Sequence, residues 1–318
     1  MRKSHGPRVL VIYKKSAYEI YVRERRNRRV QELLEAGDVA VRNLKRAHDE
    51  HRASMEKARL VLQKLGAKAT FRYRSVPVST DEFDMVVTLG GDGTLLWASH
   101  LTGANCPVVA INTAPNDSVG YFCAGSSARV EEILVDAFAG KLPERKLARM
   151  RVNVDGNCVS NRVLNDILFC HSCPAAITRF TLVVNGTEHN YKCSGLWVGP
   201  TAGSTAALLS AGGEVMPVDS RKLQYIVREP YHDAVPEHDP RAKLVMPATQ
   251  GFVEPGKQLR IINLIRAGRL FIDGPHQKWT VDIGSTVDTM LSDEPLTILG
   301  FQWEHGVQAQ GKEGPNAA

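Results

Sequence analysis

A short glycine-rich segment, Gly90-Gly91-Asp92-Gly93-Thr94, follows an apolar run typical of a buried strand and precedes a helical pattern. Glycines at such a junction let the backbone approach a ligand closely and adopt positive φ, and the free N–H groups at the helix start favour phosphate oxygens. Because a fixed carboxylate repels phosphate, Asp92 needs a chemical reason to be there. It can accept the proton of an attacking hydroxyl, or hold a magnesium ion that bridges phosphates. The segment therefore indicates phosphate chemistry; the alternative is a β-turn with a capping Asp.

Two common nucleotide fingerprints are missing from the sequence. Leu96 occupies the position where a dinucleotide fingerprint needs its third glycine. No GxxxxGK[ST] motif occurs, which argues against a Walker-type ATPase. The phosphate chemistry therefore belongs to another class of protein.

Small and hydroxyl-bearing residues dominate a second segment, which runs Gly199-Pro200-Thr201-Ala202-Gly203-Ser204-Thr205-Ala206-Ala207-Leu208-Leu209-Ser210-Ala211-Gly212-Gly213. Its Gly203-Ser204-Thr205 can cap a helix whose first turn is rich in alanine. A surface of small residues lets a flat base lie against the backbone, and the hydroxyls can donate to phosphate or ribose. The alternative is a tightly packed helix start.

The pair Asn165-Asp166 stands directly before an apolar run, residues 167–169. An amide beside a carboxylate can bind the cis hydroxyls of a ribose and the edge of an adenine. Taken alone, the pair fits a turn equally well. The sequence thus offers three separate segments that suit parts of a nucleotide.

Composition and charge limit the classes of protein that remain. The 318 residues are 43% hydrophobic and 23% charged, which excludes collagen-like, low-complexity and wholly disordered chains. The net charge of +6 suits an anionic ligand or nucleic acid. The basic run at residues 23–29 is not interleaved with aromatics, so we expect a solvated helix face and no nucleic-acid partner.

No apolar stretch is long enough to span a membrane, and no small-residue cleavage site follows the apolar run near the N-terminus. We therefore expect a cytoplasmic protein without a membrane partner. The cysteine spacing contains one CxxC and no second one, so we expect no metal site built by the protein alone.

A change in the predicted secondary structure near residue 147 divides the chain into two predicted domains. Residues 1–146 predict an α/β domain with a parallel sheet, because strand patterns at 8–13, 69–73, 83–89 and 108–111 alternate with helical ones. The helical patterns cover residues 95–98 and the long polar segment 18–65, which should break near Gly37 and stop at Gly66.

Residues 147–290 predict a β-rich domain, because apolar-rich strands alternate with hairpin signals. Those signals are Asp155-Gly156, Asn185-Gly186 and Asp273-Gly274. Residues 291–318 are expected to return a strand, 296–301, to the first domain and to end in a disordered tail, 308–318.

Together the segments at 90–94, 165–166, 203–213 and 273–274 resemble the NAD kinase family in type, order and spacing. The resemblance runs from about residue 83 to 290. Residues 192–196 and 227–230 look more like the mitochondrial-type branch of that family. The glycine-rich segment alone is shared with diacylglycerol and sphingoid lipid kinases and, loosely, with phosphofructokinases.

The resemblance implies a two-domain NAD kinase-like fold, with ATP, Mg²⁺ and NAD(H) as reactants and a homodimer or homotetramer as the assembly. By position, Asp92 would be the base on the 2′-hydroxyl of the adenosine ribose. The residues implied to bind nucleotide are Gly90, Gly91, Gly93, Thr94, Asn165, Asp166, Lys192, Ser194, Ala202, Thr205, Ala206, Ala207, Leu208, Leu209 and Ser210.

The sequence departs from the family pattern at several positions; among them, Cys193-Ser194-Gly195 stands for Gly-Asp-Gly and Pro200-Thr201-Ala202 for Thr-Pro-Thr. Ser194 stands where common members have a ribose-binding Asp, and Asp166 where they have Glu. Ala207 replaces an aromatic residue that offers a stacking face, a contact worth about 1 kcal/mol. We therefore expect NAD affinity, or the preference between NAD and NADH, to differ from the common members. Two other functions stay open: a lipid or sugar kinase that shares the glycine-rich loop, and a non-catalytic NAD(P)-binding regulator.

Overall fold

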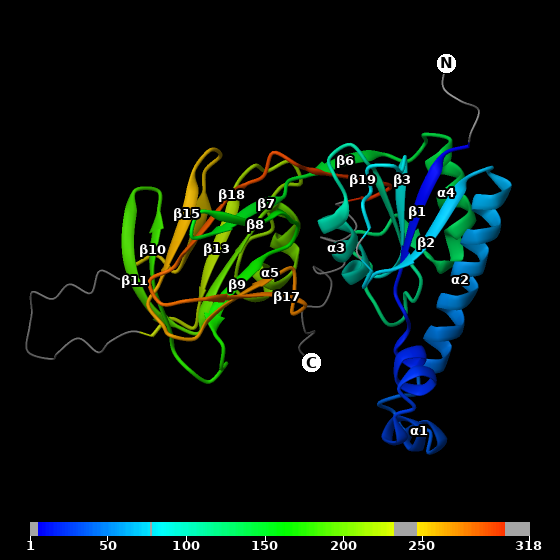
Figure 1. Ribbon diagram of the computed structural model, residues 1–318, viewed down its shortest axis with the longest axis horizontal. Helices are drawn as coiled ribbons and strands as arrows, with labels where there is room; N and C mark the ends of the chain where they lie inside the picture. Colours follow the sequence, from blue (N-terminus) through cyan, green and yellow to red (C-terminus); the bar gives the residue numbers. More distant parts are fainter. Residues whose placement is uncertain (1–5, 77, 232–246, 303–318) are drawn as a thin grey trace, which may run out of the picture. The chain divides into compact units, whose positions relative to one another are not determined.

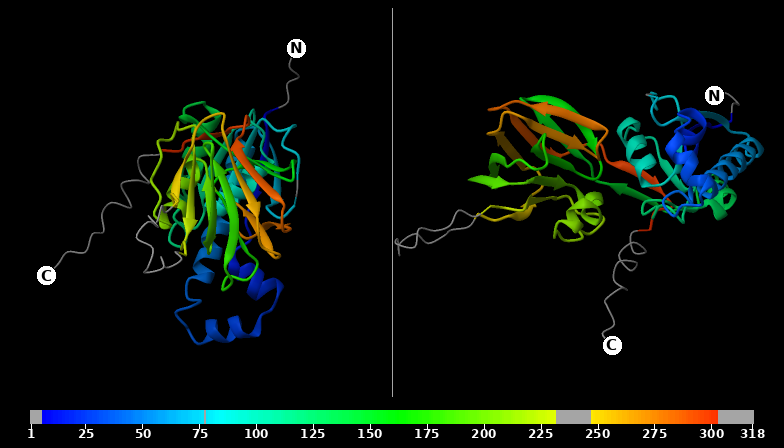
Figure 2. Two further views of the ribbon diagram at one scale, coloured as in Figure 1. Left: turned by 90° about the vertical axis from the view of Figure 1, so that its left-hand side faces the viewer. Right: turned by 90° about the horizontal axis from the view of Figure 1, so that it is seen from below.

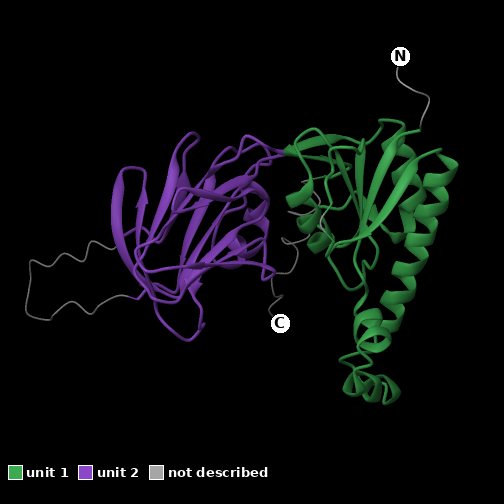
Figure 3. Cartoon of the chain, in the orientation of Figure 1, with its two compact units in different colours: residues 1–146, 296–318 green, residues 147–295 purple. Residues whose placement is uncertain are grey.

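The chain divides into two units, which Figure 3 shows in different colours. Unit 1 comprises residues 1–146 and 296–318, and unit 2 comprises residues 147–295. The computed structural model describes residues 6–76, 78–231 and 247–302, so the tail expected to be disordered lies outside the described residues. Within these ranges, no helix combines the length and the apolar character needed to cross a lipid bilayer.

Unit 1 is built on a seven-stranded sheet with the order β2-β1-β3-β4-β19-β6, and β5 pairs with β4 (Figure 1). The pairs β1–β2, β1–β3, β3–β4 and β4–β19 are parallel, which confirms the predicted α/β class. The strands are β1 (Arg8–Tyr13), β2 (Lys68–Tyr73), β3 (Met85–Gly90), β4 (Val108–Asn112), β5 (Gly125–Ser126), β6 (Glu144–Leu147) and β19 (Leu296–Leu299).

Helices cover both faces of this sheet, which explains why its central strands are apolar throughout. Helices α2 (Leu44–Lys64) and α4 (Val130–Phe138) share one apolar cluster with alternate residues of β1, β3 and β4. Helix α3 (Asp92–Leu101) follows β3 and lies on the other side of the sheet in Figure 1. The central strands β1, β3 and β4 are therefore buried on both faces, so a ligand can reach them only at their ends.

The long polar segment differs from the prediction in its middle. Three helical pieces replace the expected two: η1, a π-helix (Glu19–Glu24), α1 (Arg28–Glu35) and α2. Gly37 and Gly66 both have positive φ, as expected of helix stops. Residues 36–43 form turns, however, because Asp38 accepts the N–H of Ala40 and competes with helical bonding.

Unit 2 is a sandwich of two antiparallel sheets, seen as two layers in Figure 2. One sheet has the order β11-β10-β15-β18-β7-β8 and the other β14-β13-β12-β9-β16-β17, with one apolar cluster between them. The strands are β7 (Met150–Val154), β8 (Asn157–Val163), β9 (Ile167–His171), β10 (Thr178–Val184), β11 (Thr187–Cys193), β12 (Gly195–Gly199), β13 (Leu223–Arg228), β14 (Gln250–Val253), β15 (Gln258–Asn263), β16 (Gly268–Ile272), β17 (Gln277–Val281) and β18 (Thr286–Leu291). Two short helices follow β12, η3 (Thr201–Thr205) and α5 (Ala207–Ser210); the other short one, η2 (Ser127–Arg129), precedes α4 in unit 1.

The three predicted turns connect antiparallel strands. Asp155-Gly156 joins β7 to β8 and Asn185-Gly186 joins β10 to β11, with positive φ at all four residues. Asp273-Gly274 begins the longer connection between β16 and β17. The β-rich class of this part of the chain is therefore confirmed.

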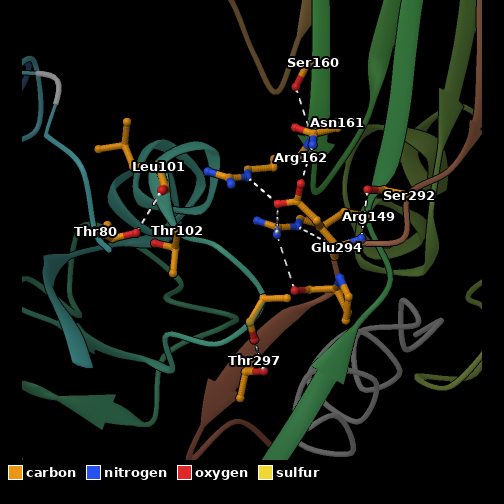
Figure 4. A network of polar contacts seen from close by, with 12 residues as sticks. Thr80, Leu101, Thr102, Arg149, Ser160, Asn161, Arg162, Ser292, Glu294 and Thr297 are labelled. Carbon is orange, nitrogen blue, oxygen red and sulfur yellow. Dashed lines mark hydrogen bonds and ion pairs between the residues drawn. The ribbon is translucent and has the colours of Figure 1, made fainter. Parts of the chain in front are cut away.

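A buried arginine closes the end of unit 2 at which the chain enters and leaves it (Figure 4). Arg149 is fully buried, and its Nε donates to the carbonyl of Glu294 at 2.6 Å. The Glu294 carboxylate in turn accepts from Arg162 Nε at 2.8 Å. Burial lowers the pKa of Arg149 to about 10, so it stays charged at neutral pH. The network fixes the end of β8, which leads directly to Asn165.

Candidate functional site

The carboxyl ends of β1, β2 and β3 bring three segments of unit 1 to one edge of its sheet. Tyr13 lies level with both Tyr73 and Leu89 in the parallel register. The chain passes from β1 to β2 on one side and later to β3 on the other, so the order of strands reverses beside β1. In open α/β sheets, ligands bind at the carboxyl edge at such a reversal. The glycine-rich loop therefore lies where this fold accepts ligands.

The glycines of the loop serve two different purposes. A Cβ on Gly90 would lie 2.2 Å from Thr94 Oγ1, and one on Gly91 would lie 2.1 Å from Ser118 Oγ, so both positions require close packing. Gly93 is exposed, and outside its own helix its Cβ would meet, among the described residues, the Arg74 guanidinium at 3.7 Å. None of the three has positive φ, so that part of the sequence prediction is wrong. Gly93 is the glycine at which a ligand can approach the backbone.

Asp92 is the first residue of α3, and its carboxylate is held by the backbone of a neighbouring loop. Its Oδ2 accepts from the Tyr121 N–H and its Oδ1 from the Phe122 N–H, both at 2.9 Å. Each oxygen keeps a second lone pair, because a carboxylate offers about four acceptor sites. The side chain is half-buried and oriented, as a group that receives a proton must be. Thr94 is buried beneath the loop, with its hydroxyl against Gly90.

Two histidines of α2 hold the segment that follows β1. His51 Nε2 donates to the Lys14 carbonyl at 2.7 Å, and its Nδ1 pairs with the Thr113 hydroxyl at 2.8 Å. His48 Nδ1 pairs with the Ser16 hydroxyl at 2.7 Å. Burial lowers the pKa of His51 to about 4, so the ring is neutral and can donate from one nitrogen and accept at the other. Helix α2 thus fixes the segment that follows β1 at the carboxyl edge of the sheet.

We expect the neutral His51 to make folding sensitive to acid. Its pKa lies at about 4 in the folded protein against 6.5 for an unburied ring, so its contribution is present above pH 6.5 and is lost as the pH falls towards 4. The full pKa shift corresponds to a decrease in the free energy of unfolding on the order of 3 kcal/mol. Urea unfolding at pH 7 and pH 5 should show a smaller acid loss for His51→Gln than for the unaltered protein. The exposed His189→Gln serves as control, and an equal acid loss in all three proteins would contradict the assignment.

In unit 2, three distant segments meet at one end of the sheet that contains β9. Ile167 lies level with Val198 on β12 and with Ile272 on β16. Asn165-Asp166 therefore lies beside the segment that follows β12 and beside Asp273. The Asp273 carboxylate accepts the N–H groups of Leu164, Asn165 and Asp166 at 2.7–3.1 Å. It fixes the pair predicted to bind ribose and adenine.

Two glycines of the small-residue segment contact the backbone of Asn165. A Cβ on Gly199 would lie 2.2 Å from the Asn165 carbonyl oxygen, and one on Gly203 would lie 1.7 Å from it. Only glycine permits this approach at either position. The small residues here are thus needed to bring two predicted binding segments together.

The hydroxyls of that segment do not cap a helix as predicted. Ser204 is fully buried, donates to the Thr201 carbonyl at 2.7 Å and accepts the Met216 N–H at 3.0 Å. Residues 201–205 form the 3₁₀ helix η3, and α5 begins only at Ala207 without a side-chain cap. The short polar side chains have bonded to nearby backbone instead of to a helix start.

The predicted binding residues of this segment differ in accessibility. Ala202 and Leu208 are fully buried, with Leu208 packed towards Gly199. Thr205 and Ser210 are less buried, and each donates to a carbonyl three or four residues earlier, at 3.3 and 3.5 Å. Ala206 and Ala207 form the junction between η3 and α5, and Leu209 lies within α5.

A cavity of about 430 Å³ opens on the outer face of the same sheet. Leu168 on β9 lies level with Trp197 on β12 and with Phe271 on β16, so the three form a continuous apolar wall. The Arg228 guanidinium lies 5.9 Å from the centre of the Trp197 ring. The other lining residues are Asp166, Cys170, His171, Ser172, Pro174, Ser194, Gly274 and Pro275. This volume and this mixture of apolar and polar walls suit a small organic ligand.

Asp166 and Ser194, predicted separately, thus line one cavity, whereas Lys192 does not line it. Lys192 lies on β11, with its ammonium 6.0 Å from the centre of the Tyr231 ring. Burial, and secondarily the charge of Asp273, raises the pKa of Asp166 to about 7. Asn165 Oδ1 is buried and has no hydrogen-bond partner among the described residues. A ligand that donates a hydrogen bond to this oxygen would supply the missing partner.

We expect Asp166 to lower the stability of the protein as the pH rises. Its pKa is about 7 when folded and near 3.8 when unfolded, so its contribution is present below pH 3.8 and is lost as the pH rises through 7. Asp166→Asn should therefore raise Tm strongly at pH 8, by a smaller amount at pH 5, and not at all below pH 3.8. Asp155→Asn is the control with the opposite sign, because the backbone N–H of Thr286 lowers the pKa of Asp155; this variant should not raise Tm at pH 8. An Asp166→Asn Tm no higher than that of the unaltered protein at pH 8 would contradict the assignment.

Sequence reasoning missed four contributors. Lys14 and Arg74 follow parallel strands, and basic residues at those strand ends were the available signal. The apolar wall of Trp197 and Phe271 depends on strand pairing across the sheet, for which the sequence carries no local signal.

A parallel sheet with a glycine-rich loop at its strand reversal, joined to a sandwich with a ligand-sized cavity, is the architecture of a nucleotide-binding α/β protein. The family model described as the ATP-NAD kinase N-terminal domain matches residues 9–141. A probable NADH kinase of Oryza sativa subsp. japonica is 35% identical over 236 residues, covering 68% of this chain and 70% of that protein. The NADH kinase of Arabidopsis thaliana is 32% identical over 248 residues, covering 71% and 74%. The chain belongs to the NAD kinase family, as the resemblance implied, and the two plant relatives fit the mitochondrial-type branch.

Two solved structures share the fold of this chain. The NAD kinase from Archaeoglobus fulgidus in complex with ATP superposes with a TM-score of 0.62 at 20% identity, covering 95% of this chain and 96% of that one. Yeast NADH kinase complexed with NADH gives a TM-score of 0.66 at 15% identity, covering 99% and 91%. The NAD kinase-like fold class is therefore confirmed.

Proposed function

We propose that this protein transfers the terminal phosphate of ATP to the 2′-hydroxyl of the adenosine ribose of NAD or NADH. The observation that carries the proposal is the oriented carboxylate of Asp92 beside an exposed glycine, at the ligand-binding edge of a chain of the NAD kinase family. Relatives named NADH kinase support the inclusion of NADH.

The proposed chemistry needs one base at the acceptor hydroxyl. A free lone pair of the Asp92 carboxylate takes the hydroxyl proton as the bond from the ribose oxygen to the γ-phosphorus forms. The bond from that phosphorus to the β–γ bridging oxygen breaks, and ADP leaves. Such base catalysis typically contributes about 10²–10⁴-fold, and the rest comes from positioning of the phosphates.

Magnesium fits this site only together with ATP. Among the described residues, no group of three or more His, Cys, Asp or Glu side chains is placed to hold a metal ion. Mg²⁺ commonly takes one or two carboxylates and completes its shell with phosphate oxygens and water. When bound, the ion would neutralise phosphate charge, and Asp92 is the carboxylate of the loop that can contact it.

For the dinucleotide, we propose that Asn165 and Asp166 bind ribose and adenine, as the family pattern implies. The buried oxygen of Asn165 suits a donor such as the adenine amino group. Trp197 and Phe271 offer aromatic faces that offset the loss of the aromatic residue at Ala207. Ser194 carries no charge where common members have a carboxylate.

One assay separates this proposal from its alternatives. Purified protein is given ATP and Mg²⁺ with NAD, NADH, diacylglycerol or a sugar in parallel, and ADP and NADP(H) are quantified. We expect NADP or NADPH in step with ADP. A lipid or sugar kinase would release ADP only with those acceptors, and a regulator would bind NAD(P) without consuming ATP. A cytoplasmic location, a homodimer or homotetramer, and the preference between NAD and NADH remain predictions.

A further inference from the structure

Two cations of unit 1 lie at the ligand-binding edge without any side-chain partner among the described residues. Lys14 directly follows β1, and Arg74 directly follows β2. The backbone N–H of Arg74 donates to the Tyr13 carbonyl at 3.0 Å. Neither side chain forms an ion pair or hydrogen bond within the described ranges. Two like charges held at neighbouring strand ends repel each other, so this edge favours an anion.

Burial, and secondarily the charge of Arg74, lowers the pKa of Lys14. The acidic groups near it do not pair with it. Asp117 is exposed, and among the described residues neither its carboxylate nor that of Asp92 forms an ion pair with Lys14. Cys123 interacts electrostatically with both Asp92 and Lys14. Burial raises the pKa of its thiol, which is therefore neutral and does not pair with Lys14.

The space beside Arg74 is where a phosphate can approach. A Cβ at Gly93 would lie 3.7 Å from Arg74 Nη1, and apart from its chain neighbours and its own helix backbone no other described atom lies within 4 Å of it. A phosphate oxygen bound to N–H groups at the start of α3 therefore comes within reach of the guanidinium. Lys14 directly follows the adjoining strand β1, and His51 donates a hydrogen bond to its carbonyl.

We propose that Lys14 and Arg74 form, with the start of α3, a binding site for the triphosphate of ATP. This inference rests on the proposed function for the identity of the nucleotide. The shared chemistry is that of a polyphosphate, which either ATP or the diphosphate of NAD could supply. Two cations and a helix N-terminus match the higher negative charge of the triphosphate, and Asp92 on the same loop places the transferring phosphate nearby.

The test compares Lys14→Met, Arg74→Met and the matched control Arg72→Met, which removes an exposed charge from β2. We expect KM for ATP to rise about tenfold or more in the first two variants, with KM for NAD unchanged, because a hydrogen bond to a charged group is lost. Arg72→Met should change neither constant. Calorimetry with inorganic tripolyphosphate should show weaker binding to the same two variants.

The thermal midpoint distinguishes binding from a structural role. Lys14→Met removes a half-buried unpaired charge and keeps the apolar stem, so Tm should stay the same or rise. If Tm falls and KM for ATP does not change, or if KM rises for NAD alone, the ATP assignment is wrong while the proposed function stands. If the unaltered protein forms no NADP(H), the proposed function fails, and tripolyphosphate binding still decides whether the polyphosphate site exists.

Discussion

Asp92→Asn should lower kcat for NADP formation by about 10²–10⁴-fold while leaving NAD binding intact. The amide keeps the size of the side chain and cannot take the proton of the ribose hydroxyl. Initial rates at saturating ATP and NAD give kcat, and calorimetry without ATP gives the NAD affinity. Undiminished kcat would remove Asp92 from the role of base.

The control for Asp92→Asn must separate chemistry from a lost backbone contact. Asp92 accepts two backbone N–H groups, and an amide can accept only through its oxygen. Asp155→Asn imposes a similar loss, since Asp155 accepts the Thr286 N–H at 2.7 Å in the turn between β7 and β8 and is not among the predicted site residues. We expect Asp155→Asn to retain full turnover. Equal loss of turnover in both variants would point to folding rather than catalysis.

Gly203→Ala should reduce kcat/KM for NAD by about 10²-fold. The new Cβ would lie 1.7 Å from the Asn165 carbonyl oxygen, so the backbone of one segment must move. A misplacement of about 1 Å at a binding group can cost about 10²-fold, and overpacking destabilises by about 1–3 kcal/mol. NAD titration and thermal unfolding measure the two effects separately.

Gly256→Ala is the matched control for Gly203→Ala. Gly256 has φ of +75° in the turn between β14 and β15, and no heavy atom lies within 4 Å of its would-be Cβ. Alanine there should cost about 1 kcal/mol through backbone strain and leave NAD binding unchanged. Wild-type affinity for NAD in Gly203→Ala would contradict the claim that this contact positions Asn165.

Local pattern was sufficient for the elements whose structure is decided by neighbouring residues. β1 spans the predicted residues, and Asp155-Gly156 and Asn185-Gly186 form the predicted two-residue turns. In these cases the apolar periodicity and the left-handed preference of Asn, Asp and Gly point to the same structure. Residues 36–43 were missed because a competing side-chain bond, that of Asp38, decides their conformation.

The candidate site was predictable in its residue types and less so in their roles. Asp273 was predicted as a turn residue, but its carboxylate also holds three N–H groups 107–109 positions away. Gly90 and Gly91 serve close packing against side chains such as Ser118, which no motif identifies. Contacts of this kind depend on the tertiary fold, so the sequence alone could not separate ligand-facing glycines from packing glycines.

The central claim is that the chain phosphorylates the dinucleotide at one hydroxyl, and the position of the phosphate in the product tests it most directly. The purified full chain is incubated with ATP, Mg²⁺ and either NAD or NADH, and the product is examined by phosphorus NMR and by an NADP-specific dehydrogenase. We expect one new phosphomonoester on the adenosine 2′-oxygen, formed in step with ADP and oxidised or reduced by that dehydrogenase. ADP without this ester, or phosphate on any other atom, would contradict the account.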